Sequence, residues 1–190
     1  MLASTLASPV PARLTETPID MIQAATMPTP IGPLTLLATD ETVHAGGFTD
    51  DVTALISGRL RTLLRDARIQ SVSDLGPITQ ALDAYFSGEA TALDRVAVAA
   101  HGGPFQQQVW EALRTIPPGR ATFYGQLAEH LGGERMARAV GMACATNLIS
   151  PIVPCHRVTH TTGYLAGYLW GLDRKRWLLD HEARHAGTAG

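Results

Sequence analysis

The sequence has few of the features that mark secreted, membrane-spanning or metal-binding proteins. It holds only two cysteines, Cys144 and Cys155, which are too few for a disulfide framework. No Cys-x-x-Cys spacing predicts a zinc site, and no apolar run reaches the length of a membrane span. The first residues lack a basic cluster followed by an apolar segment, so we expect no signal peptide. These absences favour a cytoplasmic protein with free thiols, without a metal or other cofactor.

Basic residues are scarce in the first half of the chain. Residues 1–95 carry 6 arginines and no lysine against 11 acids, whereas residues 96–190 carry 9 basic residues against 6 acids. The formal net charge of the whole chain is -2. The positive balance of the second half indicates that a polyanionic partner would bind there, although an ordinary solvated surface gives the same pattern.

Composition and periodicity divide the chain into three parts. Residues 1–24 are rich in Ala, Ser, Thr and Pro without periodicity and are expected to form a disordered leader. Residues 25–100 predict an α/β structural domain, and residues 101–190 predict a mostly helical domain that carries the chemistry. The elements expected in the first domain are strands over 30–39 and 42–48 joined by a turn at Asp40-Glu41, helices over 51–67 and 78–88, and a return strand within 93–100.

Two short helices separated by a glycine turn are predicted in the second half. Thr122 can cap a helix that Gly132 and Gly133 end, and a second helix follows within residues 134–147. This arrangement is typical of a helix-turn-helix.

The second of these helices has two different faces at 100° per residue. Val140 and Cys144 lie on the apolar face, whereas Arg138 and Gly141 lie on the opposite face. Small side chains beside an arginine let another surface approach the backbone closely, which would suit DNA. A solvated face explains the same pattern equally well.

The segment "IVPCHRV" (152–158) places Cys155 beside His156. A cysteine is a good nucleophile only as a thiolate, or with a base that takes its proton. Adjacent side chains on an extended backbone point in opposite directions, so His156 would act through a bridging water or after a bend. Glu182 falls among leucines on a predicted helix, which favours a Cys155–water–His156–Glu182 relay. The alternative is a glutamate at the helix boundary that reaches solvent.

A glycine- and aromatic-rich segment lies between the cysteine and this helix. Glycines four apart alternate with aromatic side chains, a composition that can wall a flat, apolar pocket. A DNA base that has been flipped out of the duplex would fit such a pocket. The residues concerned are Gly163, Gly167 and Gly171 with Tyr164, Tyr168 and Trp170.

Four stretches carry a close resemblance to a known family, the O6-alkylguanine-DNA alkyltransferases, also called methylated-DNA–protein-cysteine methyltransferases. They are "FQQQVWEALRTIPPGRATFYGQLA", "ARAVGMACATN", "PIVPCHRV" and "GYLAGYLWGLDRKRWLLDHE", and the resemblance extends over residues 27–184. It implies a small ribonuclease-H-like sheet with helices, followed by a mostly α domain containing a helix-turn-helix. It also implies direct-reversal DNA repair, in which a flipped O6-alkylguanine, or less readily O4-alkylthymine, loses its alkyl group irreversibly to Cys155.

The resemblance assigns roles to individual residues as well. Cys155 is the alkyl acceptor, His156 removes its proton through a water, and Glu182 orients His156. Tyr124 assists protonation of the departing base, and Asn147 ties the recognition helix to the active-site strand. The implied partner is double-stranded DNA, bound by a monomer through the minor groove. The implied DNA-binding residues are Arg138 as an arginine finger, Tyr124, Gly125, Ala137, Gly141 and Thr161, and the implied pocket residues are Cys144, Val158, Tyr168, Leu169 and Trp170.

Two positions depart from the family pattern. Leu148 follows Asn147 where relatives often have proline. Trp170 stands where several relatives have a small residue, which predicts a tighter pocket that accepts methyl better than benzyl adducts. The cysteine cluster of the bifunctional relatives and the zinc-site cysteines of some animal relatives are also missing, so we expect no phosphotriester repair.

Three other functions compete with DNA repair. A non-enzymatic lesion sensor of the alkyltransferase-like type shares the scaffold but replaces the nucleophile, whereas this chain keeps Cys155. A helix-turn-helix transcription factor would not need the PCHRV segment or a glutamate on an apolar helix face. A cysteine hydrolase would need an oxyanion hole, which no motif indicates.

Overall fold

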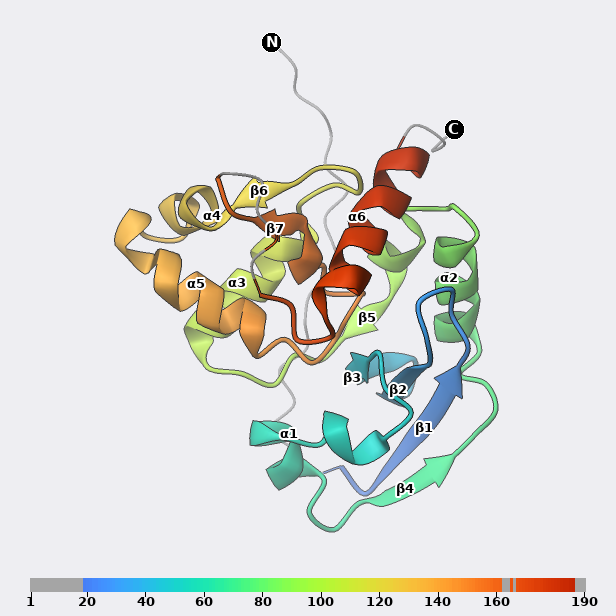
Figure 1. Ribbon diagram of the computed structural model, residues 1–190. Helices are drawn as coiled ribbons and strands as arrows, with labels where there is room; N and C mark the ends of the chain where they lie inside the picture. The colour runs from blue at the N-terminus through green and yellow to red at the C-terminus, as the bar shows by residue number, and fades with distance from the viewer. Residues whose placement is uncertain (1–18, 162–164, 166, 187–190) are drawn as a thin grey trace.

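The computed structural model describes residues 19–161, 165 and 167–186, which form a mixed α/β structure (Figure 1). The predicted mixture of sheet and helices is therefore confirmed. The β-strands are β1 (Met21–Met27), β2 (Leu34–Thr39), β3 (Thr42–Gly47), β4 (Arg68–Ser71), β5 (Ala97–Val98), β6 (Thr122–Phe123) and β7 (Val158–Thr159). The α-helices are α1 (Gly58–Leu63), α2 (Pro77–Phe86), α3 (Pro104–Arg114), α4 (Tyr124–His130), α5 (Ala137–Ala145) and α6 (Leu172–His185).

The larger sheet has the strand order β4-β1-β2-β3-β5. Its three central strands are antiparallel, and the edge strands β4 and β5 run parallel to β1 and β3. Asp40 and Glu41 connect β2 to β3 with φ angles of 45° and 62°, the left-handed backbone that tight hairpin turns require. The predicted pair of strands and its turn are confirmed.

Two sequence predictions in the first half are wrong. The disordered leader was predicted over residues 1–24, but its last four residues belong to β1. This strand begins at Met21 and buries Ile22 and Ala24. Small residues gave β1 little apolar signal, but it pairs with β2 on one side and β4 on the other. The rest of that leader, residues 1–18, lies outside the described residues.

The single helix predicted over residues 51–67 is the second error. The chain forms a 3₁₀ helix at Val52–Leu55, then α1, and then β4. Gly58 has a φ angle of 52°, which a continuous right-handed helix cannot contain.

The short strand β6 corrects a prediction in the second half. Thr122 does not cap α4, because its backbone pairs in parallel with Val158 of β7. The residue before the helix is Phe123, whose N–H donates to the Gln126 side chain at 3.3 Å. The predicted faces of α5 are confirmed, since Val140 and Cys144 are buried and Arg138 is exposed.

One hydrophobic core extends across the boundary predicted at residue 100. It joins Leu36, Leu82 and Val98 to residues of the second half such as Leu113 and Leu178. The division into two domains stays a prediction.

Backbone hydrogen bonds and a helix also connect the two parts of the chain. The Gly46 N–H donates to Leu148 O at 2.6 Å, and the Ser150 N–H donates to Gly46 O at 2.8 Å. Figure 1 shows α6 standing between α2 and the group formed by α3, α4 and α5. Among the described residues, no helix is both long and apolar enough to cross a membrane.

Candidate active site

Cys155 begins a single turn of 3₁₀ helix, Cys155–Arg157, which follows α5 and precedes β7. The sequence left open a bridging water or a bend between Cys155 and His156, and the structure shows a turn at this point. Cys155 is 6% exposed, and its N–H donates to Val153 O at 2.9 Å. The thiol is therefore held on a short, buried turn rather than on a mobile loop.

Asn147 fixes the thiol to the end of α5. Its side-chain Nδ2 donates to the Sγ atom of Cys155 at 3.1 Å and to Val153 O at 2.8 Å. Its Oδ1 accepts a hydrogen bond from the Ile149 N–H at 2.9 Å. Because Asn147 is buried, these contacts form without competition from water. One side chain thus links α5, the segment 149–153 and the sulfur.

Opposing effects act on the pKa of the Cys155 thiol. Burial raises it, while the hydrogen bond from Asn147 and the positive charge of Lys175 work to lower it. Lys175 is itself buried on α6, and its Nζ donates to Val158 O at 2.8 Å. The net pKa stays above that of an ordinary cysteine. The thiol therefore needs a base to become a thiolate at neutral pH.

His156 is fully buried and pairs with Glu182 of α6. Its Nε2 lies 2.9 Å from the Oε1 atom of Glu182, so this nitrogen carries the proton in the neutral ring. The Nδ1 atom is buried and has no hydrogen-bond partner among the described residues. Burial lowers the pKa of His156, and Glu182 opposes that shift. A neutral imidazole with a lone pair on Nδ1 can accept a proton.

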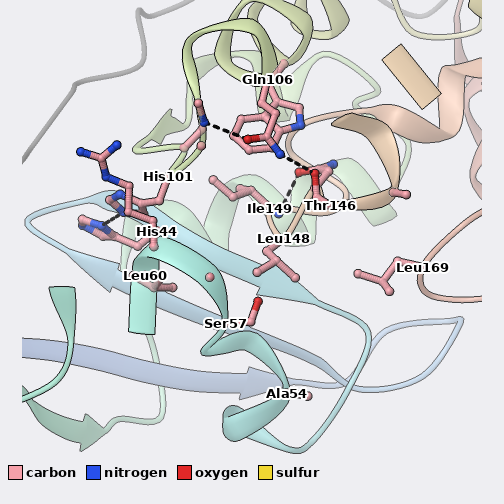
Figure 2. A pocket seen from close by; sticks show the side chains of 18 of the residues that line it. His44, Ala54, Ser57, Leu60, His101, Gln106, Thr146, Leu148, Ile149 and Leu169 are labelled. Carbon is pink, nitrogen blue, oxygen red and sulfur yellow. Dashed lines mark hydrogen bonds between the residues drawn. The ribbon is translucent and has the colours of Figure 1, made fainter. Parts of the chain in front are cut away.

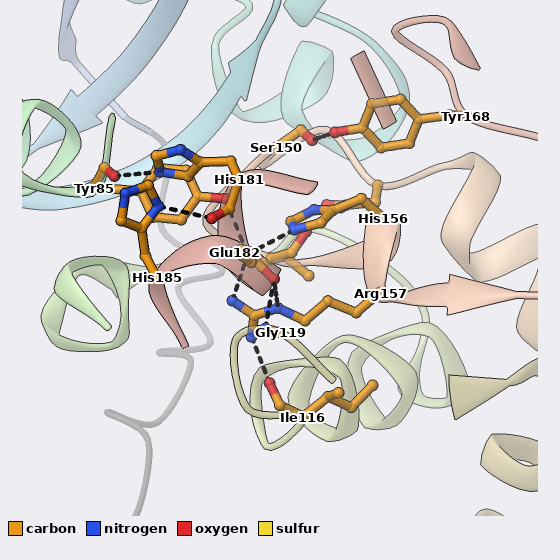
Figure 3. Close-up of polar contacts among 12 residues, drawn as sticks. Tyr85, Ile116, Gly119, Ser150, His156, Arg157, Tyr168, His181, Glu182 and His185 are labelled. Atoms are coloured by element: carbon orange, nitrogen blue, oxygen red, sulfur yellow. Dashed lines mark hydrogen bonds and ion pairs between the residues drawn. The ribbon is translucent and has the colours of Figure 1, made fainter. Parts of the chain in front are cut away.

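Glu182 is the centre of the polar cluster in Figure 3. Its Oε1 accepts from His156 Nε2, from Arg157 NH2 and from the Tyr85 hydroxyl, each at 2.9 Å. Its Oε2 accepts from Arg157 Nε at 2.9 Å and from the Gly119 N–H at 3.3 Å. Burial works to raise the pKa of Glu182, but His156 and Arg157 outweigh it and hold the pKa well below its ordinary value. The carboxylate is charged at any working pH.

Sequence reasoning missed two members of this cluster. Arg157 lies within PCHRV but received no role, although a buried glutamate requires a cationic partner and Arg157 is two residues from the nucleophile. Its NH1 also donates to Ile116 O. Tyr85 gave no local signal, because it lies 97 residues before Glu182 in the chain.

Tyr124 is brought toward the cysteines by the β6–β7 pairing, since it is the first residue of α4. Its ring centroid lies 5.9 Å from that of His160. Burial raises the pKa of Tyr124 to about 12, with smaller contributions from Cys144 and Cys155. Tyr124 is therefore a hydroxyl donor at neutral pH.

The other predicted pocket residues have different exposures. Val158 is buried, Leu169 is 52% exposed, and the Tyr168 hydroxyl lies 2.6 Å from Ser150 Oγ. Gly163 and Tyr164, which the glycine–aromatic pattern included, lie outside the described residues.

The predicted DNA-binding residues lie at the start of α4 and along α5, except Thr161, which follows β7. Arg138 and Thr161 are exposed, and Ala137 is half-buried. A Cβ atom added at Gly125 would meet nothing within 4 Å, and one added at Gly141 would come no closer than 4.0 Å, to the Tyr124 ring. The fold itself does not require glycine at either position.

A cavity of about 590 Å³ lies between the sheet and the second half of the chain (Figure 2). His44, His101 and Gln106 line it together with Asn147 and Trp170. The residues that line it do not include Cys155, His156 or Tyr124.

Trp170 packs against the sheet at the edge of this cavity. A Cβ atom added at Gly47 would lie 2.0 Å from the Trp170 ring. The tryptophan therefore depends on a glycine in β3, and this contact places its ring against the sheet.

Comparisons with known proteins place these residues in context. Residues 104–184 match the family model described as "6-O-methylguanine DNA methyltransferase, DNA binding domain". A methylated-DNA–protein-cysteine methyltransferase from Shigella flexneri is 48% identical over 112 residues, which are 59% of this chain and 66% of that protein. One from Mycobacterium bovis is 41% identical over 169 residues, covering 87% of this chain and 95% of the relative. A crystal structure of Mycobacterium tuberculosis OGT in complex with DNA superimposes with a TM-score of 0.71 at 34% identity, covering 86% of this chain and 94% of that chain.

Proposed function

Because this chain belongs to the methylated-DNA–protein-cysteine methyltransferase family, we propose that it repairs alkylated DNA by direct reversal. The alkyl group of O6-alkylguanine, or less readily of O4-alkylthymine, moves to Cys155 in a single turnover. The observation that carries this proposal is the arrangement of the buried thiol, which Asn147 holds at 3.1 Å beside the paired His156 and Glu182.

The chemistry follows from the roles of these side chains. The Nδ1 atom of His156 takes the thiol proton through a water, and Glu182 stabilises the resulting imidazolium. The thiolate of Cys155 attacks the alkyl carbon, so an S–C bond forms while the C–O6 bond breaks. The electron pair leaves with the guanine, and the protonated hydroxyl of Tyr124 stabilises the charge that develops on the base.

DNA binding is assigned to the α4–α5 pair acting as a helix-turn-helix in the minor groove, with the target base flipped out. Arg138 fills the gap that the base leaves. Gly125, Ala137 and Gly141 let the backbone approach the duplex, and Thr161 contacts it. The open space around both glycines supports this assignment, because the fold leaves their small size unexplained. The larger, ribonuclease-H-like sheet has a structural role, and the protein acts as a cytoplasmic monomer.

The experiment is to incubate the protein with a duplex containing O6-methylguanine and to locate the adduct by mass spectrometry. Residues 139–156 contain no lysine or arginine, so one tryptic peptide holds both Cys144 and Cys155. The variants Cys144→Ala and Cys155→Ala therefore assign the site. We expect one methyl group on the wild type and on Cys144→Ala, and none on Cys155→Ala.

Binding measurements separate repair from lesion sensing. Cys155→Ala should still bind the lesion duplex while leaving it methylated. A wild-type protein that binds the duplex and acquires no methyl group would be a sensor, and the repair function would be refuted.

A further inference from the structure

Tyr85 reaches the active-site cluster from α2, in the half of the chain that carries none of the expected chemistry. Its side chain is fully buried, and its hydroxyl donates to Glu182 Oε1 at 2.9 Å. The same oxygen accepts the hydrogen bond from His156 Nε2. A single atom of the carboxylate therefore couples Tyr85 to the histidine.

We propose that Tyr85 is a positioning residue for the His156–Glu182 pair, an inference that rests on the proposed function. By donating to Oε1, the tyrosine fixes the carboxylate in the orientation that keeps the proton of His156 on Nε2. The lone pair on Nδ1 is then available for the thiol proton. The hydroxyl also draws charge from Oε1, which limits how strongly Glu182 stabilises the imidazolium.

The hydroxyl of Tyr85 is held rigidly by the packing of α2 on α6. His181 Nε2 lies 2.7 Å from Tyr85 O, so the backbone of Tyr85 is fixed to the helix that carries Glu182 (Figure 3). The Tyr85 ring makes edge contacts with Phe86 and with His181, both at centroid distances of 5.2 Å. A phenylalanine would keep these ring contacts and lose only the hydroxyl.

Tyr85 also stays a donor throughout the working range. Burial raises the pKa of Tyr85 well above its ordinary value, and the negative charge of Glu182 raises it further. Other charged or titratable groups that act on this cluster include Arg157, Lys175 and His181 of α6, Tyr168, and Asp94, which precedes β5. The substitution of Tyr85 changes none of them.

The test compares Tyr85→Phe with His181→Gln. The second variant removes the ring that contacts Tyr85, keeps a side-chain N–H that can donate to Tyr85 O, and leaves the hydrogen bonds of Glu182 in place. Single-turnover methyl transfer from a lesion duplex is measured from pH 5 to 9, with duplex affinity and thermal unfolding measured in parallel. For Tyr85→Phe we expect a rate about tenfold lower at neutral pH, unchanged duplex affinity, and a rate profile displaced to higher pH.

The direction of the displacement follows from the charge on Glu182. Without the tyrosine donor the carboxylate holds the imidazolium more strongly, so the pKa of His156 rises and the neutral base forms at higher pH. His181→Gln should keep the wild-type midpoint. A wild-type rate and midpoint in Tyr85→Phe would overturn the proposal. A lower rate with an unmoved midpoint would also overturn it, because a purely structural defect has that signature.

A second reaction keeps this test independent of the repair function. In a Cys144→Ala background, alkylation of Cys155 by iodoacetamide reports the same proton transfer without DNA. If the wild type accepted no methyl group from DNA, the proposed function would fail, and the iodoacetamide profile of Tyr85→Phe would still show whether its midpoint moves.

Discussion

Replacing Glu182 with glutamine removes a buried negative charge that accepts five hydrogen bonds. The change preserves the shape of the side chain but leaves the Arg157 guanidinium, which is 3% exposed, without its counter-charge. One of the two carboxylate oxygens is also replaced by an amide NH2 group, which faces hydrogen-bond donors and cannot accept from them. Removing one partner of a buried ion pair lowers the free energy of unfolding by about 3–5 kcal/mol. At 2–4 °C per kcal/mol for a chain of 190 residues, the midpoint of thermal unfolding should fall by roughly 6–20 °C.

Urea unfolding followed by circular dichroism measures this loss. Glu89→Gln is the matched control, because Glu89 pairs with Arg95 at 2.8 Å on the surface, with side chains 50% and 58% exposed. That variant should lose at most about 1 kcal/mol. If Glu182→Gln lost no more than Glu89→Gln, the assignment of Glu182 as a buried, charged partner of Arg157 would be wrong.

Acid titration gives the same prediction a second test. The pKa of Glu182 is depressed in the folded protein, so its stabilising contribution is complete above its ordinary pKa of 4.5 and is lost as the pH falls toward the folded value. The unfolding free energies of the wild type and of Glu182→Gln should therefore converge below pH 4.5. A constant difference between pH 7 and pH 3 would contradict this reasoning.

Four further substitutions have distinct expected results. Gly141→Ala should stabilise α5 by roughly 0.5–1 kcal/mol in thermal unfolding, because the added methyl has space, and weaken duplex binding in a titration; unchanged binding would exclude close backbone approach. Asn147→Ala should destabilise the protein by about 1–3 kcal/mol. Because it removes the donor to the Cys155 thiol, it should also move the pH profile of iodoacetamide reactivity to higher pH, and an unmoved profile would refute the effect of Asn147 on the thiol. Trp170→Ala should raise the rate with O6-benzylguanine relative to O6-methylguanine, and a faster benzyl than methyl reaction in the wild type would contradict the tight pocket. In thermal unfolding, Gly47→Ala should destabilise the wild type more than it destabilises Trp170→Ala, because the added methyl collides with the ring.

Local signals predicted the parts of the fold that are determined locally. Asp40 and Glu41 interrupt two apolar runs, and they form the hairpin turn of β2 and β3. The helical period of α5 separated a buried Val140 from an exposed Arg138. The apolar run around Gly58 misled the prediction, because a glycine can sit within a helix or end one, and only its φ angle distinguishes the two.

The site was predictable where its residues are close in sequence or periodic on a helix. The apolar face of α6 indicated that Glu182 is buried, and its contact with His156 is seen at 2.9 Å. Arg157 could have been added by charge balance alone. Tyr85 could not, because the hydroxyl of a tyrosine on an amphipathic helix has no sequence signature that names its partner. Contacts across 97 residues depend on the packing of whole elements.

The continuous core constrains protein engineering. A chimaera that exchanged the matched segment 104–184 for that of a relative would cut through the Gly46 bridge to Leu148 and Ser150, and would separate Tyr85 from Glu182. A graft would therefore need compatible residues at these recipient positions. A chimaera of this scaffold should therefore exchange segment 104–184 together with the parts of β3 and α2 that contact it.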